Sequence, residues 1–314
     1  MKKKRIRKKT NEKIKQHVPQ RRIITKIIFI TFFLFILSLI VSMLSVILLI
    51  PSIDAIKDEN VILGAHRGNA IDYIENTIEA FQSALDEPRY KFIEFDVQYT
   101  KDKIPIIYHD QGLIRLHRKS YNVKDLTYAQ LQNITRFHIP TYEEVMELIA
   151  GKKPLDIELK SQGNFTDDKI LVQYIVEDCK RRNIMNTTIF SSVSKEVVIE
   201  FKNQYPKIKT GKIYYTIESS FFGTEFLTSK LYQEIEEMDA DFVMLHGANI
   251  RNYRQLKENL PEEKILVIWY FTDEMYILDS NLNFDSSVSA LKPNLFRWIN
   301  EKFVKPKEKC LWWC

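Results

Sequence analysis

Two stretches at the start of the chain are defined by what they lack. Residues 1–26 hold twelve Lys and Arg but a single acid, Glu12, and residues 27–50 hold no charged side chain. The whole chain carries +5 and the first stretch about +11, so residues 51–314 carry −6. This balance argues against a nucleic-acid-binding body, whereas the basic tail suits an anionic surface.

The uncharged run is long enough to cross a membrane. As a helix, its 24 residues would span roughly 36 Å, against about 30 Å for a hydrocarbon core. A cleaved signal peptide has a shorter apolar core and a small-residue cleavage site, which residues 49–53 do not offer. A buried helix of a globular domain would show a polar face. We therefore expect a single uncleaved transmembrane helix at 27–50.

The flanking charges predict the orientation of this helix. The basic residues precede it, and Asp54, Asp58 and Glu59 follow it closely. The positive-inside rule then places a cytoplasmic tail at 1–26 and the remainder of the chain outside the plasma membrane. A large domain at 60–303 and a C-terminal tail at 304–314 complete the expected organisation.

Cysteine is scarce, with three in the chain. Cys179 lies in a predicted helix and is expected to be a small buried hydrophobic residue. Cys310 and Cys314 could pair outside the cell, or belong to a frayed terminus. The sequence does not decide between these two, and it leaves the oligomeric state open.

Apolar runs and amphipathic segments alternate along the body. This serial order favours an α/β fold, a TIM (β/α)₈ barrel, over an open sheet. We expect strands at 61–66, 92–97, 104–109, 155–160, 187–192, 208–215, 241–246 and 264–271, with a weak last strand near 284–288. We expect helices after residue 76 or 77 and at 141–149, 167–182, 194–204, 227–238, 249–259 and 272–279.

Charged residues gather where these strands end, the edge at which barrels of this type place their chemistry. Glu94 and Asp96 are two apart on one strand and face the same side, as do Glu158 and Lys160 on another. Three carboxylates without cysteine form a hard oxygen site, which suits Ca²⁺ or Mg²⁺ rather than structural Zn²⁺.

Two histidines and two cations complete the candidate site. His66 and His109 suit acid–base work, one deprotonating an attacking hydroxyl and the other protonating a leaving oxygen. Arg67 and Lys160 could hold phosphate oxygens.

Each of these residues also has a structural interpretation. Asn76 could be only a helix cap, and Glu94 or Glu158 only a member of an ion pair. His117, His138 and His246 are left out as structural or surface residues, although His246 ends a strand.

Several motifs are similar to those of the glycerophosphodiester phosphodiesterase family. Its H-R-G and E-N-T stand at 66–68 and 75–77, its E-x-D-V at 94–97, its H-D at 109–110, its I-P-T at 139–141 and its E-x-K at 158–160. The resemblance covers about residues 60–300 and implies a metal-dependent barrel that hydrolyses glycerophosphodiesters to an alcohol and glycerol 3-phosphate. It implies His66 and His109 as the acid–base pair and a divalent metal on Glu94, Asp96 and Glu158. For the substrate it implies Arg67, Lys160, Glu75, Asn76 and Trp269.

The chain departs from the family pattern at Ile74, in the segment after Trp269 and near its last strand. These changes leave the substrate open between a soluble glycerophosphodiester and a lysophospholipid, sphingophospholipid or polyglycerolphosphate at the membrane. They also leave room for a catalytically inert binding protein.

Overall fold

The computed structural model describes residues 24–42, 61–214, 225–247, 256, 258–270 and 274–278. The chain divides into two compact units, residues 1–50 and 51–314. Most of the basic tail, residues 43–50, the expected strand at 284–288, Cys310 and Cys314 lie outside the described residues.

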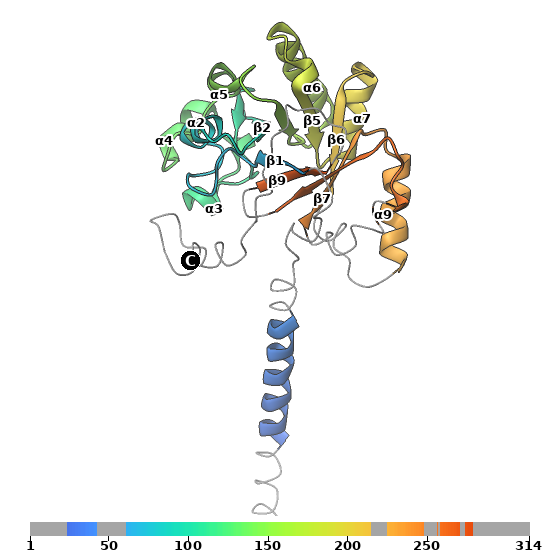
Figure 1. Ribbon diagram of the computed structural model, residues 1–314. Helices are drawn as coiled ribbons and strands as arrows, with labels where there is room; N and C mark the ends of the chain where they lie inside the picture. The colour runs from blue at the N-terminus through green and yellow to red at the C-terminus, as the bar shows by residue number, and fades with distance from the viewer. Residues whose placement is uncertain are drawn as a thin grey trace, which may run out of the picture. The chain divides into compact units, whose positions relative to one another are not determined.

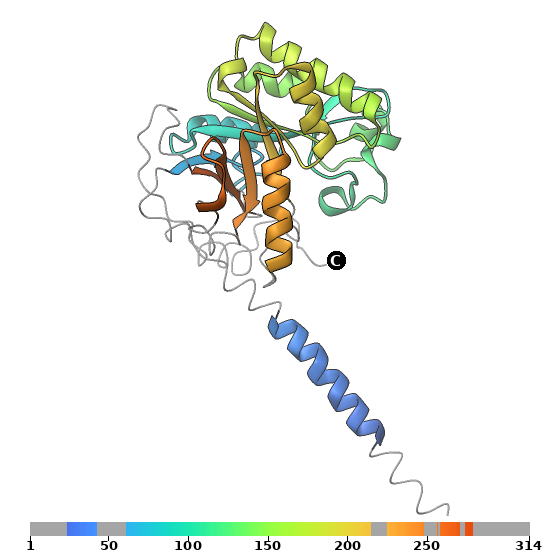
Figure 2. The same cartoon turned by 90° about the vertical axis from the view of Figure 1, so that its right-hand side faces the viewer.

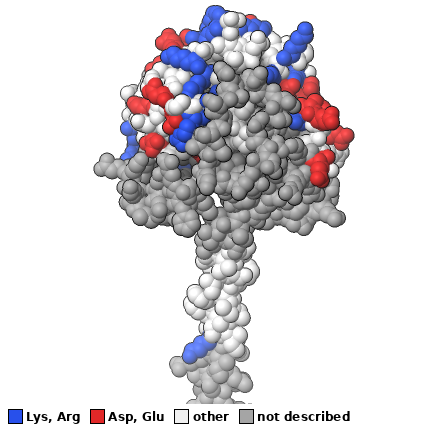
Figure 3. Space-filling view, in the orientation of Figure 1, with Lys and Arg blue, Asp and Glu red and all other residues white. Residues whose placement is uncertain are grey.

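The described residues of the first unit form one helix, Ile24–Ser42. It begins three residues before the expected span, and all of its 19 residues are exposed. Lys26 is its only charged residue, and on the face shown in Figure 3 the helix is otherwise white. By length and composition this helix could cross a membrane.

The second unit is built on a closed eight-stranded barrel, which confirms the predicted fold (Figure 1). Seven of these strands run parallel to one another. They are β1 (Val61–Ala65), β2 (Phe92–Tyr99), β4 (Leu155–Leu159), β5 (Thr188–Ser192), β6 (Lys209–Ile213), β7 (Phe242–His246) and β8 (Ile265–Trp269). The eighth strand, β9 (Glu274–Leu278), closes the ring between β8 and β1.

The closing strand corrects one prediction. The sequence pattern indicated a short helix at 272–279, but residues 274–278 form β9, which is antiparallel to both of its neighbours. Four residues separate β8 from β9, a length that permits a hairpin but no parallel crossover. Met275 and Ile277 face the barrel interior, and Tyr276 and Leu278 face outward, so the true period is two.

The helices cover the outer face of the strands. Helix α2 (Ile78–Asp86) lies beside α5 (Tyr142–Ile149), and α6 (Phe165–Arg181) lies beside α7 (Lys195–Gln204). In Figure 2, α9 (Glu225–Glu237) is the orange helix alongside the barrel. Side-chain oxygens cap two of these helices: Thr77 accepts from Ala80 N in α2, and Thr141 forms a capping box in α5.

An excursion between β2 and α5 carries part of the site. It begins with β3 (Pro105–Ile107), which pairs antiparallel with β2 outside the closed ring. Helix α3 (Ile114–His117), a 3₁₀ turn (Val123–Asp125) and α4 (Tyr128–Ile134) follow. A small core of its own, which includes Leu113 and Leu131, holds this segment together.

Alternating side chains give the barrel two cores. Ile93, Phe95 and Val97 of β2 join the large core between the strands and the helices. Phe92 of the same strand points inward, into a core shared with β5 to β9. Gly64 of β1 leaves the space for it, because a Cβ there would lie 2.1 Å from the Phe92 ring.

Gly64→Ala should therefore destabilise the barrel through overpacking, by about 1–3 kcal/mol. Thermal unfolding of the full chain in detergent micelles measures the effect. Gly112→Ala is the matched control, because its added methyl would make ordinary contacts at 3.6 Å. Equal melting temperatures for the two variants would contradict the close packing of Phe92 on Gly64.

Candidate active site

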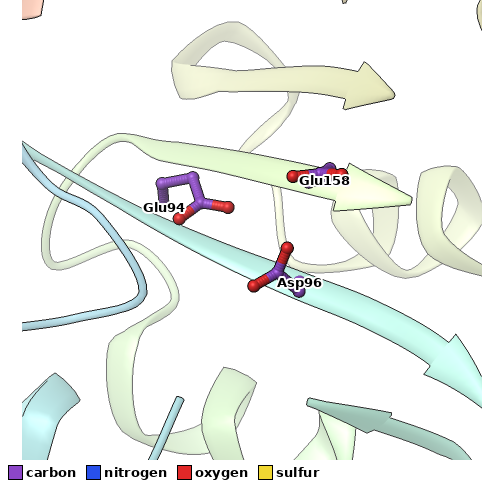
Figure 4. Close-up of side chains that lie close together, drawn as sticks. All are labelled: Glu94, Asp96 and Glu158. Carbon is purple, nitrogen blue, oxygen red and sulfur yellow. The ribbon is translucent and has the colours of Figure 1, made fainter. Parts of the chain in front are cut away.

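Three buried carboxylates lie together on the neighbouring strands β2 and β4. Glu94 and Asp96 come from β2 and Glu158 from β4, and each offers an oxygen within 4.8 Å of the others (Figure 4). Asp96 and Glu158 are partners in the parallel register of the two strands. The sequence predicted this grouping, because residues two apart on a strand share a face.

Without a bound cation, the burial of these three carboxylates is electrostatically unfavourable. Burial, with Asp96 and Glu158 adding to it, raises the pKa of Glu94 well above its usual value. Burial also acts on Asp96, but Lys160, His109 and Arg67 hold the pKa of its carboxyl well below the usual range. Glu94 Oε1 is buried without a hydrogen-bond partner among the described residues. A hard divalent cation fits this set of oxygens, since it would neutralise them and use the unpartnered atom.

The loop after β1 folds over these carboxylates. Arg67 and Gly68 both have positive φ, at 60° and 75°. This conformation turns the Arg67 amide toward β2, where it donates to Glu94 Oε2 at 2.7 Å. A non-glycine residue in the left-handed region costs of order 1–3 kcal/mol, so the surrounding contacts must hold it there.

His66 is placed against the same carboxylate. Its Nε2 lies 3.7 Å from Glu94 Oε2, and its side chain is almost fully buried. Burial, and next Arg67, lower the pKa of His66 to about 3. Its ring centroid is 6.5 Å from that of Trp269, which stands at the end of β8. His246, which sequence reasoning set aside, packs edge-on against Trp269 at 4.9 Å.

Asn76 is not the cap of α2, because Thr77 is. It has a positive φ of 57°, and its amide donates to Asp96 Oδ2 at 2.8 Å. Asn76 therefore orients a carboxylate of the cluster. Its position there supports the functional interpretation over the helix-cap one.

Lys160 follows the end of β4 and pairs with two of the three carboxylates. Its Nζ is 2.7 Å from Asp96 Oδ1 and also contacts Glu158 Oε1. The partial neutralisation this gives explains why the cluster tolerates burial.

His109, the second candidate histidine, lies in the segment after β3. Its Nδ1 is 2.6 Å from Asp110 Oδ1. Burial acts on Asp110, but hydrogen bonds from His109 and Arg115 hold its pKa well below the usual range. Arg115 in turn binds Glu75 through two nitrogens, at 2.6 Å each. Sequence reasoning identifies Asp110 only as part of the H-D motif and misses Arg115, because nothing in their spacing indicates this contact.

Asp156 is a second residue that sequence reasoning missed. It lies on β4 two residues before Glu158, so the period of the strand already placed it on the same face. It pairs in register with Glu94 and accepts a hydrogen bond from Ser191 Oγ at 2.6 Å. Burial, opposed by this bond and reinforced by Glu158, raises the pKa of Asp156 to about 7.

The fold and the site together define a TIM barrel with a carboxylate and histidine cluster at its mouth. Residues 66–221 match the model of the Glycerophosphoryl diester phosphodiesterase family. This segment of the chain belongs to that family.

Known proteins are similar in sequence to part of the chain. A glycerophosphodiester phosphodiesterase of Caldanaerobacter subterraneus subsp. tengcongensis is 32% identical over 161 residues, 48% of this chain and 65% of the relative. One of Bacillus altitudinis is 38% identical over 46% of this chain and 63% of its own length. Human Lysophospholipase D GDPD1 is 29% identical over 43% and 46%. The chain thus spans less than two thirds of the length of these relatives.

Solved structures share the fold. A phosphodiesterase of Oleispira antarctica, in complex with the product sn-glycerol-3-phosphate, superposes with a TM-score of 0.54 at 21% identity, covering 68% of this chain and 86% of the other. A glycerophosphodiester phosphodiesterase of Parabacteroides distasonis gives 0.52 at 19% identity, covering 65% and 82%.

Asp156→Asn should stabilise the protein more at about pH 8 than at about pH 5. The pKa of Asp156 rises from 3.8 to about 7 on folding, so the folded state binds more protons than the unfolded state between these two pH values. Its contribution to stability is therefore largest at low pH and falls as the pH rises toward 7. Melting temperatures of wild type and variant in EDTA measure the difference. A gain that does not depend on pH would contradict a buried, protonated Asp156.

Proposed function

We propose that the barrel is a metal-dependent phosphodiesterase that hydrolyses glycerophosphodiesters to an alcohol and glycerol 3-phosphate. The observation that carries the proposal is the cluster of Glu94, Asp96 and Glu158, with the His66 ring directly against it. Family membership and the names of the relatives support the same activity.

Glu94, Asp96 and Glu158 would hold the cation, which we expect to be Ca²⁺ or Mg²⁺. When bound, it would neutralise charge on a phosphate oxygen. His66 and His109 are the proposed acid–base pair. Because Asp110 occupies the Nδ1 side of His109, its Nε2 remains for proton transfer with the substrate.

The remaining residues bind or orient. Arg67 and Lys160 supply positive charge for the phosphate, although both also neutralise Asp96. Glu75 supports the site by binding Arg67 at 2.9 Å, and Asn76 supports it by binding Asp96. Trp269, beside His66, offers an apolar surface for the part of the substrate that carries no charge.

A membrane substrate is the second candidate. Ile114 and Tyr121 follow His109 in the chain and are 66% and 55% exposed, and the backbone bond from Leu113 N to Tyr121 O brings them together. Apolar side chains in water near the site favour contact with an acyl chain or a bilayer. Relatives named lysophospholipase D point the same way.

His66→Ala and His109→Ala should each lower kcat by about 10²–10⁴-fold, because each removes one partner of the proposed acid–base pair. The full chain in micelles is assayed for release of glycerol 3-phosphate from glycerophosphocholine, with Ca²⁺ or Mg²⁺ and with EDTA. His138→Ala is the matched control. His138 is a half-exposed histidine on the excursion after β3, and it pairs with Glu144 of α5.

EDTA should abolish the activity, and added cation should restore it. Wild-type protein that releases neither glycerol 3-phosphate from any glycerophosphodiester nor lysophosphatidate and alcohol from a lysophospholipid would instead favour an inert binding protein. Faster turnover of lysophospholipid or polyglycerolphosphate than of soluble diesters would favour the membrane substrate.

We also propose that Ile24–Ser42 anchors the chain, with the basic tail in the cytoplasm and the barrel outside the plasma membrane. The protein should then stay in the membrane pellet after alkaline carbonate extraction, because extraction strips peripheral proteins but not spanning helices. Protease added to intact cells should digest the barrel. A barrel that is released by carbonate, or is protected from the protease, would contradict the anchor or its orientation.

A further inference from the structure

A continuous chain of ion pairs connects the two halves of the site. Asp110 lies between His109 and Arg115, with Arg115 Nε donating to its Oδ2 at 2.7 Å. Arg115 also binds Glu75, which binds Arg67, and Arg67 Nε lies 3.4 Å from Asp96. The network therefore runs from one proposed acid–base histidine to a proposed metal ligand.

Arg115 is the centre of this network because its guanidinium holds two carboxylates at once. Its Nη1 and Nη2 each donate to Glu75 at 2.6 Å, and its Nε and Nη2 donate to Asp110 at 2.7 and 3.1 Å. The two carboxylates lie 35 residues apart in the chain and belong to different loops. Only the planar fork of an arginine offers donors for two such pairs, and a lysine ammonium cannot reproduce them.

The burial of these groups makes the contacts significant. The Arg115 side chain is 27% exposed, and the side chains of Asp110 and Glu75 are 21% and 12% exposed. Solvent screens such pairs less than it screens fully exposed ones. The pairs also tie α3, a helix of only four residues, to the loop that leads into α2.

The contact with Asp110 sets the state of His109. An ionised carboxylate can only accept hydrogen bonds, so the Nδ1 that faces Asp110 carries the proton of the neutral ring. The Nε2 is then the basic nitrogen. Arg115 fixes the position of the Asp110 carboxylate, and with it the orientation and tautomer of His109.

We propose that Arg115 is a positioning residue that holds His109 in its working tautomer and keeps Arg67 in place through Glu75. The kinetic part of this inference rests on the proposed phosphodiesterase activity.

Arg115→Lys should lower kcat by about 10- to 100-fold while KM changes little, the size of effect seen when an outer partner of a functional group is removed. The assay uses the full chain in micelles, loaded with the cation that supports wild-type turnover. Arg89→Lys is the matched control, because Arg89 pairs with Glu87 in the turn before β2, at the end of that strand away from the site. Activity of Arg115→Lys equal to that of Arg89→Lys would overturn the proposal.

Arg115→Ala adds a test by chemical rescue. Free guanidinium should restore part of the lost kcat in Arg115→Ala and none in His109→Ala, because only the first variant leaves a space between two carboxylates.

Asp110→Asn should lower kcat similarly, and its combination with Arg115→Lys should cost less than the product of the two losses. Independent, multiplicative losses would show that the two residues do not act together. Asp110→Asn by itself tests the proposal even if Arg115→Lys folds poorly, because it keeps the arginine; an unchanged kcat in this variant would overturn the proposal.

Nitrogen-15 NMR of histidine-labelled protein tests the same claim without activity. The His109 signal is identified by its absence in His109→Gln. In the wild type it should report a single tautomer with hydrogen on Nδ1, and in Arg115→Lys a mixture. An unchanged tautomer overturns the proposal even for a protein that hydrolyses diesters, and a changed one supports it even if no diester is turned over. An inactive wild type therefore counts against the proposed function alone.

Discussion

Burial of like charges at the mouth of the barrel is the constraint on which the rest of the site depends. Glu94, Asp96 and Glu158 are removed from water within 4.8 Å of one another, a state that ionised carboxylates reach only with compensation. Each contact around these carboxylates supplies part of this compensation. Lys160 pairs with two of them, the Arg67 backbone donates to the first, and Asn76 donates to the second.

The same constraint explains why the backbone is unusual at this place. Arg67, Gly68 and Asn76 all adopt left-handed conformations, and two of these residues donate directly to the carboxylates. Such conformations persist only where the surrounding contacts are strong enough to hold them. The compensation is nevertheless incomplete, because Glu94 Oε1 and Asp156 Oδ2 are buried without hydrogen-bond partners in the described part of the chain. This remaining deficit is the physical reason for proposing a divalent cation at the cluster.

Much of this architecture could be predicted from the pattern of residues. The alternation of strands and helices predicted the barrel, and the period of two predicted which side chains of β2 face the interior. The prediction was wrong where local pattern was ambiguous. Residues 274–278 are short and apolar enough for either a helix or a strand, and pairing with both β8 and β1 decided for the strand. The same period of two also places Asp156 on the face of β4 that carries Glu158, but sequence reasoning did not include it.

By itself, the sequence determined the barrel, the inward carboxylates and an apolar helix long enough for a membrane. These follow from short-range periodicity and from the length of an uncharged run, both of which can be read along the chain. Only the tertiary structure decided which groups meet across loops: Asn76 with Asp96, and Arg115 with both Glu75 and Asp110. Those pairs join residues that are distant in the chain and share no period. They depend on how the loops close over the barrel mouth, where hydrogen bonding to buried charge selects the arrangement.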